Sequence, residues 1–153
     1  MRFLFIDEIH ELVPGKRIVA IAHIADDEAY FADHFPGFPV VPGVLLTEMM
    51  GQAAARCLDH DLENRGKAIL ARIKSAGFRG WVRPGETVAL HAEIRSDREQ
   101  FATAACKAEV AGKEVASAEL MFGFLPITTF PADLRRSLVD QFARERPGRK
   151  LDT

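Results

Sequence analysis

A histidine and a glutamate, 14 residues apart, are the residues of this chain best suited to chemistry. His34 opens a turn that carries three closely spaced prolines, and Glu48 follows within an apolar segment. A carboxyl group surrounded by aliphatic side chains is costly to keep ionised, so its presence there calls for an explanation. A rigidly held imidazole supplies one, because the two side chains would then form a pair of proton-transfer groups in an apolar slot.

The segment that carries the glutamate has the periodicity of a helix from Gly43 to about Leu58. Apolar residues cover most of its circumference, and a helix of that kind has to be enclosed by the rest of the fold. Its polar residues Glu48, Gln52 and Arg56 recur every four positions, so they form one narrow stripe. The sequence therefore predicts a central helix with a single polar line on which Glu48 lies.

The remaining periodic segments favour strands. Residues before a turn at 14–16 are expected to form a short strand or the entry to a helix, and residues 18–22 are rich in β-branched side chains. After the helix, we expect four adjacent strands with short turns, at 68–73, 88–94, 101–110 and 114–125. A run of strands beside one central helix predicts an α+β fold, not the alternation of a doubly wound sheet.

The chain has 153 residues, which suits a single domain. We predict that residues 1–126 form this domain and that residues 127–153 are an extension. Pro131 can open a helix in the extension, with Leu134, Leu138 and Phe142 on one face. Pro147 ends that pattern, and the last residues are expected to be loose.

Composition excludes several classes of function. Twenty basic and 22 acidic side chains give a formal charge of −2, which provides no electrostatic case for binding nucleic acid or a membrane surface. The longest stretch without an Asp, Glu, Lys or Arg, residues 34–47, is too short to span a bilayer. Cys57 and Cys106 form no CxxC motif, the histidines lack metal-ligand spacing, and the first residues lack a signal-peptide pattern. We therefore expect a cytoplasmic protein with free thiols and no metal site.

Residues 34–45 and 48–53 resemble the bacterial 3-hydroxyacyl-acyl carrier protein dehydratases of the FabZ type. The similarity covers about residues 3–123, with further matching segments at 14–20, 73–79, 82–86, 112–113 and 118–121. The resemblance implies a hotdog fold, in which an antiparallel sheet wraps one long helix. It also implies a homodimer whose two sheets join, and such dimers often assemble further into hexamers as trimers of dimers.

By this resemblance, His34 matches the catalytic histidine and Glu48 the catalytic acid, contributed by opposite subunits. Gly43 matches the glycine whose backbone N–H meets the thioester carbonyl. The implied reaction is dehydration of a (3R)-hydroxyacyl-acyl carrier protein to the trans-2-enoyl form, in fatty-acid or related lipid or polyketide biosynthesis. A glutamate at 48, where the isomerising branch of the family has aspartate, favours dehydration without isomerisation. Met49 and Gly51 depart from the usual pattern, which has alanines.

The partner implied is acyl carrier protein, whose phosphopantetheine arm carries the substrate, and the reaction needs no metal or redox cofactor. Five apolar residues either line the acyl tunnel or fill the core: Phe35, Phe38, Met49, Phe78 and Trp81. Two other functions stay open. A hotdog thioesterase would need a carboxylate or activated water aimed at the carbonyl, and a non-catalytic subunit would bind the acyl carrier protein without chemistry.

Overall fold

The structure, a computed structural model, describes the backbone of residues 2–144 and the side chains of residues 2–140. The predicted end of the C-terminal helical pattern at Pro147, the loose last residues and the side chain of Phe142 lie outside these described residues.

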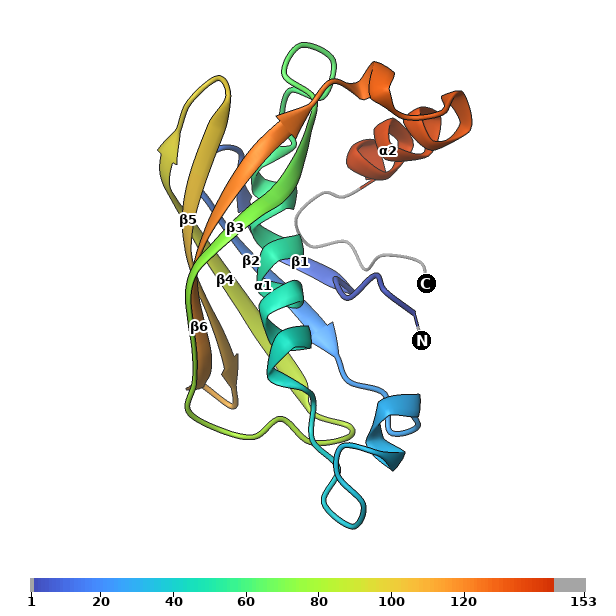
Figure 1. Ribbon diagram of the computed structural model, residues 1–153, viewed down its shortest axis with the longest axis vertical. Coiled ribbons are helices and arrows are strands. Elements are labelled where there is room, and N and C mark those ends of the chain that lie inside the picture. Colours follow the sequence, from blue (N-terminus) through green and yellow to red (C-terminus); the bar gives the residue numbers. More distant parts are fainter. Residues whose placement is uncertain (1, 145–153) are drawn as a thin grey trace.

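One antiparallel sheet and one long helix make up the body of the protein (Figure 1). The helix α1 spans Gly43–Leu58, the range expected from the sequence. A short 3₁₀ turn, η1, precedes it at Ala29–Ala32. The six strands are β1 (Glu8–Val13), β2 (Arg17–His23), β3 (Lys67–Phe78), β4 (Thr87–Asp97), β5 (Phe101–Val110) and β6 (Lys113–Leu125).

The sheet order β1-β2-β4-β5-β6-β3 differs from the expected succession of neighbouring strands. β4, β5 and β6 do follow one another through hairpins, but β3 pairs with β6 at the far edge, so the prediction that β3 adjoins β4 was wrong. The connection at 79–86 crosses the sheet instead of turning back on itself. β3 is also longer than predicted. Its last residues are mostly exposed and lack the alternation of buried and exposed side chains that marks a half-buried strand, so the sequence pattern did not indicate them.

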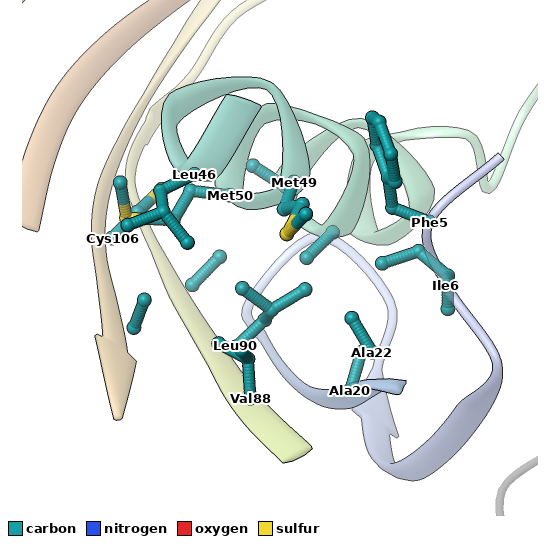
Figure 2. Packing of buried hydrophobic residues seen from close by; sticks show 14 of the residues in the cluster. Phe5, Ile6, Ala20, Ala22, Leu46, Met49, Met50, Val88, Leu90 and Cys106 are labelled. Atoms are coloured by element: carbon teal, nitrogen blue, oxygen red, sulfur yellow. The ribbon is translucent and has the colours of Figure 1, made fainter. Parts of the chain in front are cut away.

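The core lies between α1 and the concave face of the sheet. Met49 and Met50 are fully buried, and they face small or branched residues of β2 and β4 such as Ala20 and Leu90 (Figure 2). The expectation of an enclosed helix is thus confirmed. This arrangement, an antiparallel sheet curved around one long helix, is the hotdog fold that the resemblance implied.

The C-terminal end of α1 is tied to the start of β3 by Asp59, which is 2% exposed. Its carboxylate accepts a hydrogen bond from the N–H of Ala68 at 2.9 Å and pairs with Nζ of Lys67 at 2.6 Å. A buried carboxylate is costly without such partners, and these two contacts join the C-cap of α1 to the first residues of β3.

Beyond β6 the chain forms a 3₁₀ turn, η2 (Ile127–Thr129), and a second helix, α2 (Ala132–Arg144). α2 begins one residue after Pro131, as expected of a proline that opens a helix. The division of the chain into a domain ending at residue 126 and an extension stays a prediction. Among the described residues, no helix is long and apolar enough to cross a membrane.

Both cysteines are buried, and we predict that neither reacts with Ellman's reagent in the folded protein at pH 8. Burial raises the pKa of Cys57 to about 11, and burial together with the neighbouring Cys57 raises that of Cys106 to about 12. The reagent reacts with thiolate, and about one thiol in a thousand or fewer is ionised at pH 8 with such pKa values. Both thiols should react after unfolding in urea. Rapid reaction of either thiol in the native protein would contradict the burial described here.

Candidate active site

His34 is held in place by three hydrogen bonds within its own loop. Its N–H donates to Tyr30 O at 2.9 Å, and its carbonyl accepts from the N–H of Val40 at 3.0 Å. The ring nitrogen Nδ1 lies 3.1 Å from Val40 O. A backbone carbonyl can only accept, so Nδ1 carries the hydrogen. In the neutral imidazole Nε2 then carries the lone pair. A histidine that acts as a general base through Nε2 requires this tautomer.

The rest of the loop fixes the plane of the imidazole. Phe35 and Phe38 exchange two backbone hydrogen bonds of 2.8 Å across a tight turn, and Gly37 within the turn has a φ of 77°, in the left-handed region that glycine tolerates. The Phe35 ring stacks on that of His34, with centroids 4.0 Å apart. The N–H of Val41 then bonds Val82 O at 2.8 Å, which ties the loop to the segment before β4.

Gly43 is the first residue of α1, and Pro42 precedes it as the N-cap. Among the described residues, no backbone acceptor meets its N–H, as is usual at the start of a helix, where partial positive charge accumulates. A Cβ on Gly43 would come within 3.0–3.1 Å of three ring atoms of Phe78. The ring of Phe78 thus packs directly against the backbone of Gly43 and would have to shift by a few tenths of an ångström to accommodate a side chain there.

Glu48 is half-buried on α1, about 7–8 Å along the axis from Gly43 at 1.5 Å per residue. Its Oε1 accepts a hydrogen bond of 3.1 Å from Nε2 of Gln52, one turn further along the helix. Gln52 is bonded in turn to the backbone of Phe3 and Phe5. The sequence predicted Gln52 beside Glu48 on the polar stripe. It did not predict that the N-terminal segment contacts Gln52, because that segment makes the contacts through backbone atoms, which no side-chain pattern reveals.

His34 lies in the loop between η1 and α1, and Glu48 lies in the second turn of α1. No hydrogen bond or ring contact joins them within one chain, as far as residues 2–140 are concerned. The single chain therefore presents a histidine and a carboxyl group separately, each held by its own partners.

Four of the five apolar residues expected to line a tunnel or fill the core are exposed in the single chain. They are Phe35, Phe38, Phe78 and Trp81, with exposed fractions of 39–61%. Phe38 and Trp81 meet edge to face at 5.7 Å, and the guanidinium of Arg83 lies 5.3 Å from the Phe38 ring centre. The fifth, Met49, is fully buried in the core. Of these aromatic residues, Phe78 packs against Gly43 at the start of α1 and Phe35 packs against His34, and an apolar ligand or a second chain could cover the exposed rings.

No cluster of three or more His, Cys, Asp or Glu side chains that could hold a metal ion occurs in the described part of the chain.

The FabA-like domain family matches residues 1–119, and the chain belongs to this family. A curated relative from Lactobacillus helveticus, named 3-hydroxyacyl-[acyl-carrier-protein] dehydratase FabZ, is 42% identical over 120 residues, which cover 78% of this chain and 81% of the relative. The protein of the same name from Enterococcus faecalis is 41% identical over 121 residues and covers 78% of this chain and 86% of its own length.

Solved structures with the same fold are more distant in sequence. The dehydratase heterocomplex ApeI:P from Xenorhabdus doucetiae matches with a TM-score of 0.60 at 16% identity, covering 78% of this chain and 98% of that one. The fluoroacetyl-CoA thioesterase FlK matches with a TM-score of 0.64 at 19% identity, covering 82% and 97%. Since a dehydratase and a thioesterase match equally well, these structures support the hotdog fold and do not distinguish between the two chemistries.

Proposed function

We propose that this protein is a hydro-lyase that converts (3R)-hydroxyacyl-acyl carrier protein to the trans-2-enoyl form in fatty-acid biosynthesis. The observation that carries the proposal is the hydrogen bond from His34 Nδ1 to Val40 O, because it leaves Nε2 free to take a proton. Relatives about 40% identical over most of the chain bear the name of this activity.

In the proposed reaction, Nε2 of His34 removes a proton from C2 of the acyl chain. Glu48 donates a proton to the 3-hydroxyl group, the C3–O bond breaks, and the electron pair of the former C2–H bond forms the C2=C3 double bond as water leaves. The N–H of Gly43, at the positive end of the α1 dipole, donates to the thioester oxygen, on which negative charge develops as the C2 proton leaves. Transfer of a proton from the imidazolium back to Glu48 restores both groups.

A homodimer joined through β3 would bring the two side chains together. β3 is an edge strand of 12 residues that pairs on one side with β6, and its exposed side chains include Ile69, Ile73 and Phe78. A long strand edge that pairs with no other strand among the described residues is a template for pairing with a second copy. In the proposed dimer the sheets continue across the two-fold axis, and His34 of one chain faces Glu48 of the other. Assembly of three such dimers into a hexamer extends the proposal.

The same dimer would cover the aromatic residues that are exposed in the single chain. Phe35, Phe38, Phe78 and Trp81, together with the fully buried Met49, are the proposed lining of an acyl tunnel that excludes water from the reacting atoms. The substrate arrives on the phosphopantetheine arm of acyl carrier protein. In the proposed reaction His34, Glu48 and Gly43 supply the base, the acid and the oxyanion contact, so no metal or redox cofactor takes part. The proposed location is the cytoplasm.

The direct test is turnover of 3-hydroxyacyl-acyl carrier proteins of several chain lengths, followed by mass spectrometry of the intact carrier protein. We expect the acylated carrier to lose the mass of one water and the enoyl thioester to appear in the ultraviolet spectrum. Release of free carrier-protein thiol would identify a thioesterase instead. Tight binding of the acylated carrier without any change in its mass would identify a non-catalytic subunit. Either result would overturn the proposal.

A further inference from the structure

The side-chain amide of Gln52 makes three hydrogen bonds that join Glu48 to the N-terminal segment of the chain. Its Nε2 donates to the backbone oxygen of Phe3 at 2.7 Å and to Oε1 of Glu48 at 3.1 Å. Its Oε1 accepts from the N–H of Phe5 at 3.0 Å. A single amide thus holds two backbone groups from the start of the chain and one carboxyl group from the middle of α1.

The partners of Gln52 permit one orientation of the amide. An amide nitrogen carries two hydrogens to donate, and both are used by acceptors, whereas the amide oxygen faces a donor. Rotating the amide by half a turn would set its oxygen against Phe3 O and the Glu48 carboxyl, and would leave its nitrogen facing the N–H of Phe5. The N-terminal segment therefore selects the orientation in which Gln52 donates to Glu48.

The N-terminal segment is itself firmly anchored to the body of the protein. Phe5 and Ile6 are at most 9% exposed and pack in the core beside α1 (Figure 2). The N–H of Asp7 then bonds Ile21 O at 2.8 Å, and its carboxylate accepts from the N–H of His23 at 2.6 Å. Residues 3–5 consequently act as a fixed strap beside the polar stripe of α1.

We propose that the strap formed by Phe3–Phe5 is a positioning element of the active site, which acts through Gln52 to hold the carboxyl group of Glu48 in one conformation. This inference rests on the catalytic role proposed for Glu48. Without the strap, Gln52 keeps one of its three partners, and both side chains regain rotamers that do not point at the substrate. Small displacements of a reacting group cost rate steeply, so we expect a loss of about tenfold in kcat with little change in KM.

Two variants test the proposal. In the first, residues 2–4 are deleted, so that Met precedes Phe5. The acceptor at Phe3 O is lost and the N–H of Phe5 stays, which leaves Gln52 with two of its three partners. In the second, Gln52→Met, a side chain of similar length makes none of the three hydrogen bonds, and because position 52 is half-buried the chain should still fold. Gln52→Met should lower kcat about tenfold, and the deletion should lower it by less because the Phe5 contact stays. The double variant should be no worse than Gln52→Met alone, because both changes break the same connection.

Arg2→Ala is the matched control. Arg2 pairs with Asp7 at 3.8 Å and makes none of the Gln52 contacts, so this variant should keep wild-type kcat. Additive losses in the double variant would show that the deletion does not act through Gln52, and a lower melting temperature with unchanged kcat would show that the strap only stabilises the fold. Either result would overturn the proposal.

A crystal structure of the deletion variant separates failure of this inference from failure of the proposed function. Glu48 in several conformers would support the strap even if the wild-type protein had no dehydratase activity. Glu48 and Gln52 in the same single conformer as in the intact chain would overturn it, whatever the activity.

Discussion

Replacing His34 by Ala is expected to lower kcat for dehydration about 100- to 10,000-fold, the usual cost of losing a positioned base. The chain should still fold, because His34 is partly exposed and its backbone hydrogen bonds to Tyr30 and Val40 survive the substitution. Glu48→Gln is expected to lose activity to a similar degree. Glutamine has the size of glutamate and its amide oxygen can still accept from Gln52, but it cannot supply a proton to the 3-hydroxyl group.

The measurement is the rate of enoyl-thioester formation, with thermal unfolding as the check on folding. Glu63→Gln is the matched control, since Glu63 is an exposed glutamate in the loop after α1 and should retain wild-type turnover. Turnover close to that of the wild type in the His34 or Glu48 variant would rule out the role assigned to that residue.

The sequence predicted those parts of the fold that depend on local periodicity. The apolar residues around most of α1 and its single polar stripe predicted both the helix and its burial. The turn at 111–113 predicted the hairpin between β5 and β6. Sheet order depends instead on pairing between distant segments, which no short-range pattern specifies. The placement of β3 beside β6 was therefore missed, although this placement leaves β3 at an edge where a second chain can pair with it.

The candidate site was predictable in its residue types and not in its connections. His34 and Glu48 were selected because a carboxyl group in an apolar helix and a histidine in a proline-rich turn are both unusual. The tautomer of His34 depends on the carbonyl of Val40, and the setting of Glu48 depends on Gln52 and the backbone of residues 3–5. Backbone donors and acceptors are the same at every position, so the sequence holds no signal for such contacts.

Mixing the His34→Ala chain with the Glu48→Gln chain is expected to restore about a quarter of wild-type activity. If each site takes its histidine from one subunit and its glutamate from the other, a mixed dimer contains one site with both residues intact and one with neither. Random pairing makes half of the dimers mixed, and half of the sites in those dimers are complete.

The two chains can be co-expressed with different affinity tags, and the doubly tagged dimers, once isolated from the random mixture, should show about half of wild-type activity because every one of them has one complete site in two. Mixing His34→Ala with the double variant His34→Ala/Glu48→Gln provides the control, because no dimer in that mixture has an intact histidine and none should be active. A site built from a single subunit would leave the first mixture as inactive as its components. That result would contradict the proposal that β3 joins two chains so that each completes the other's site. His34 and Glu48 would then have to meet within one chain, although the described residues show no contact between them there.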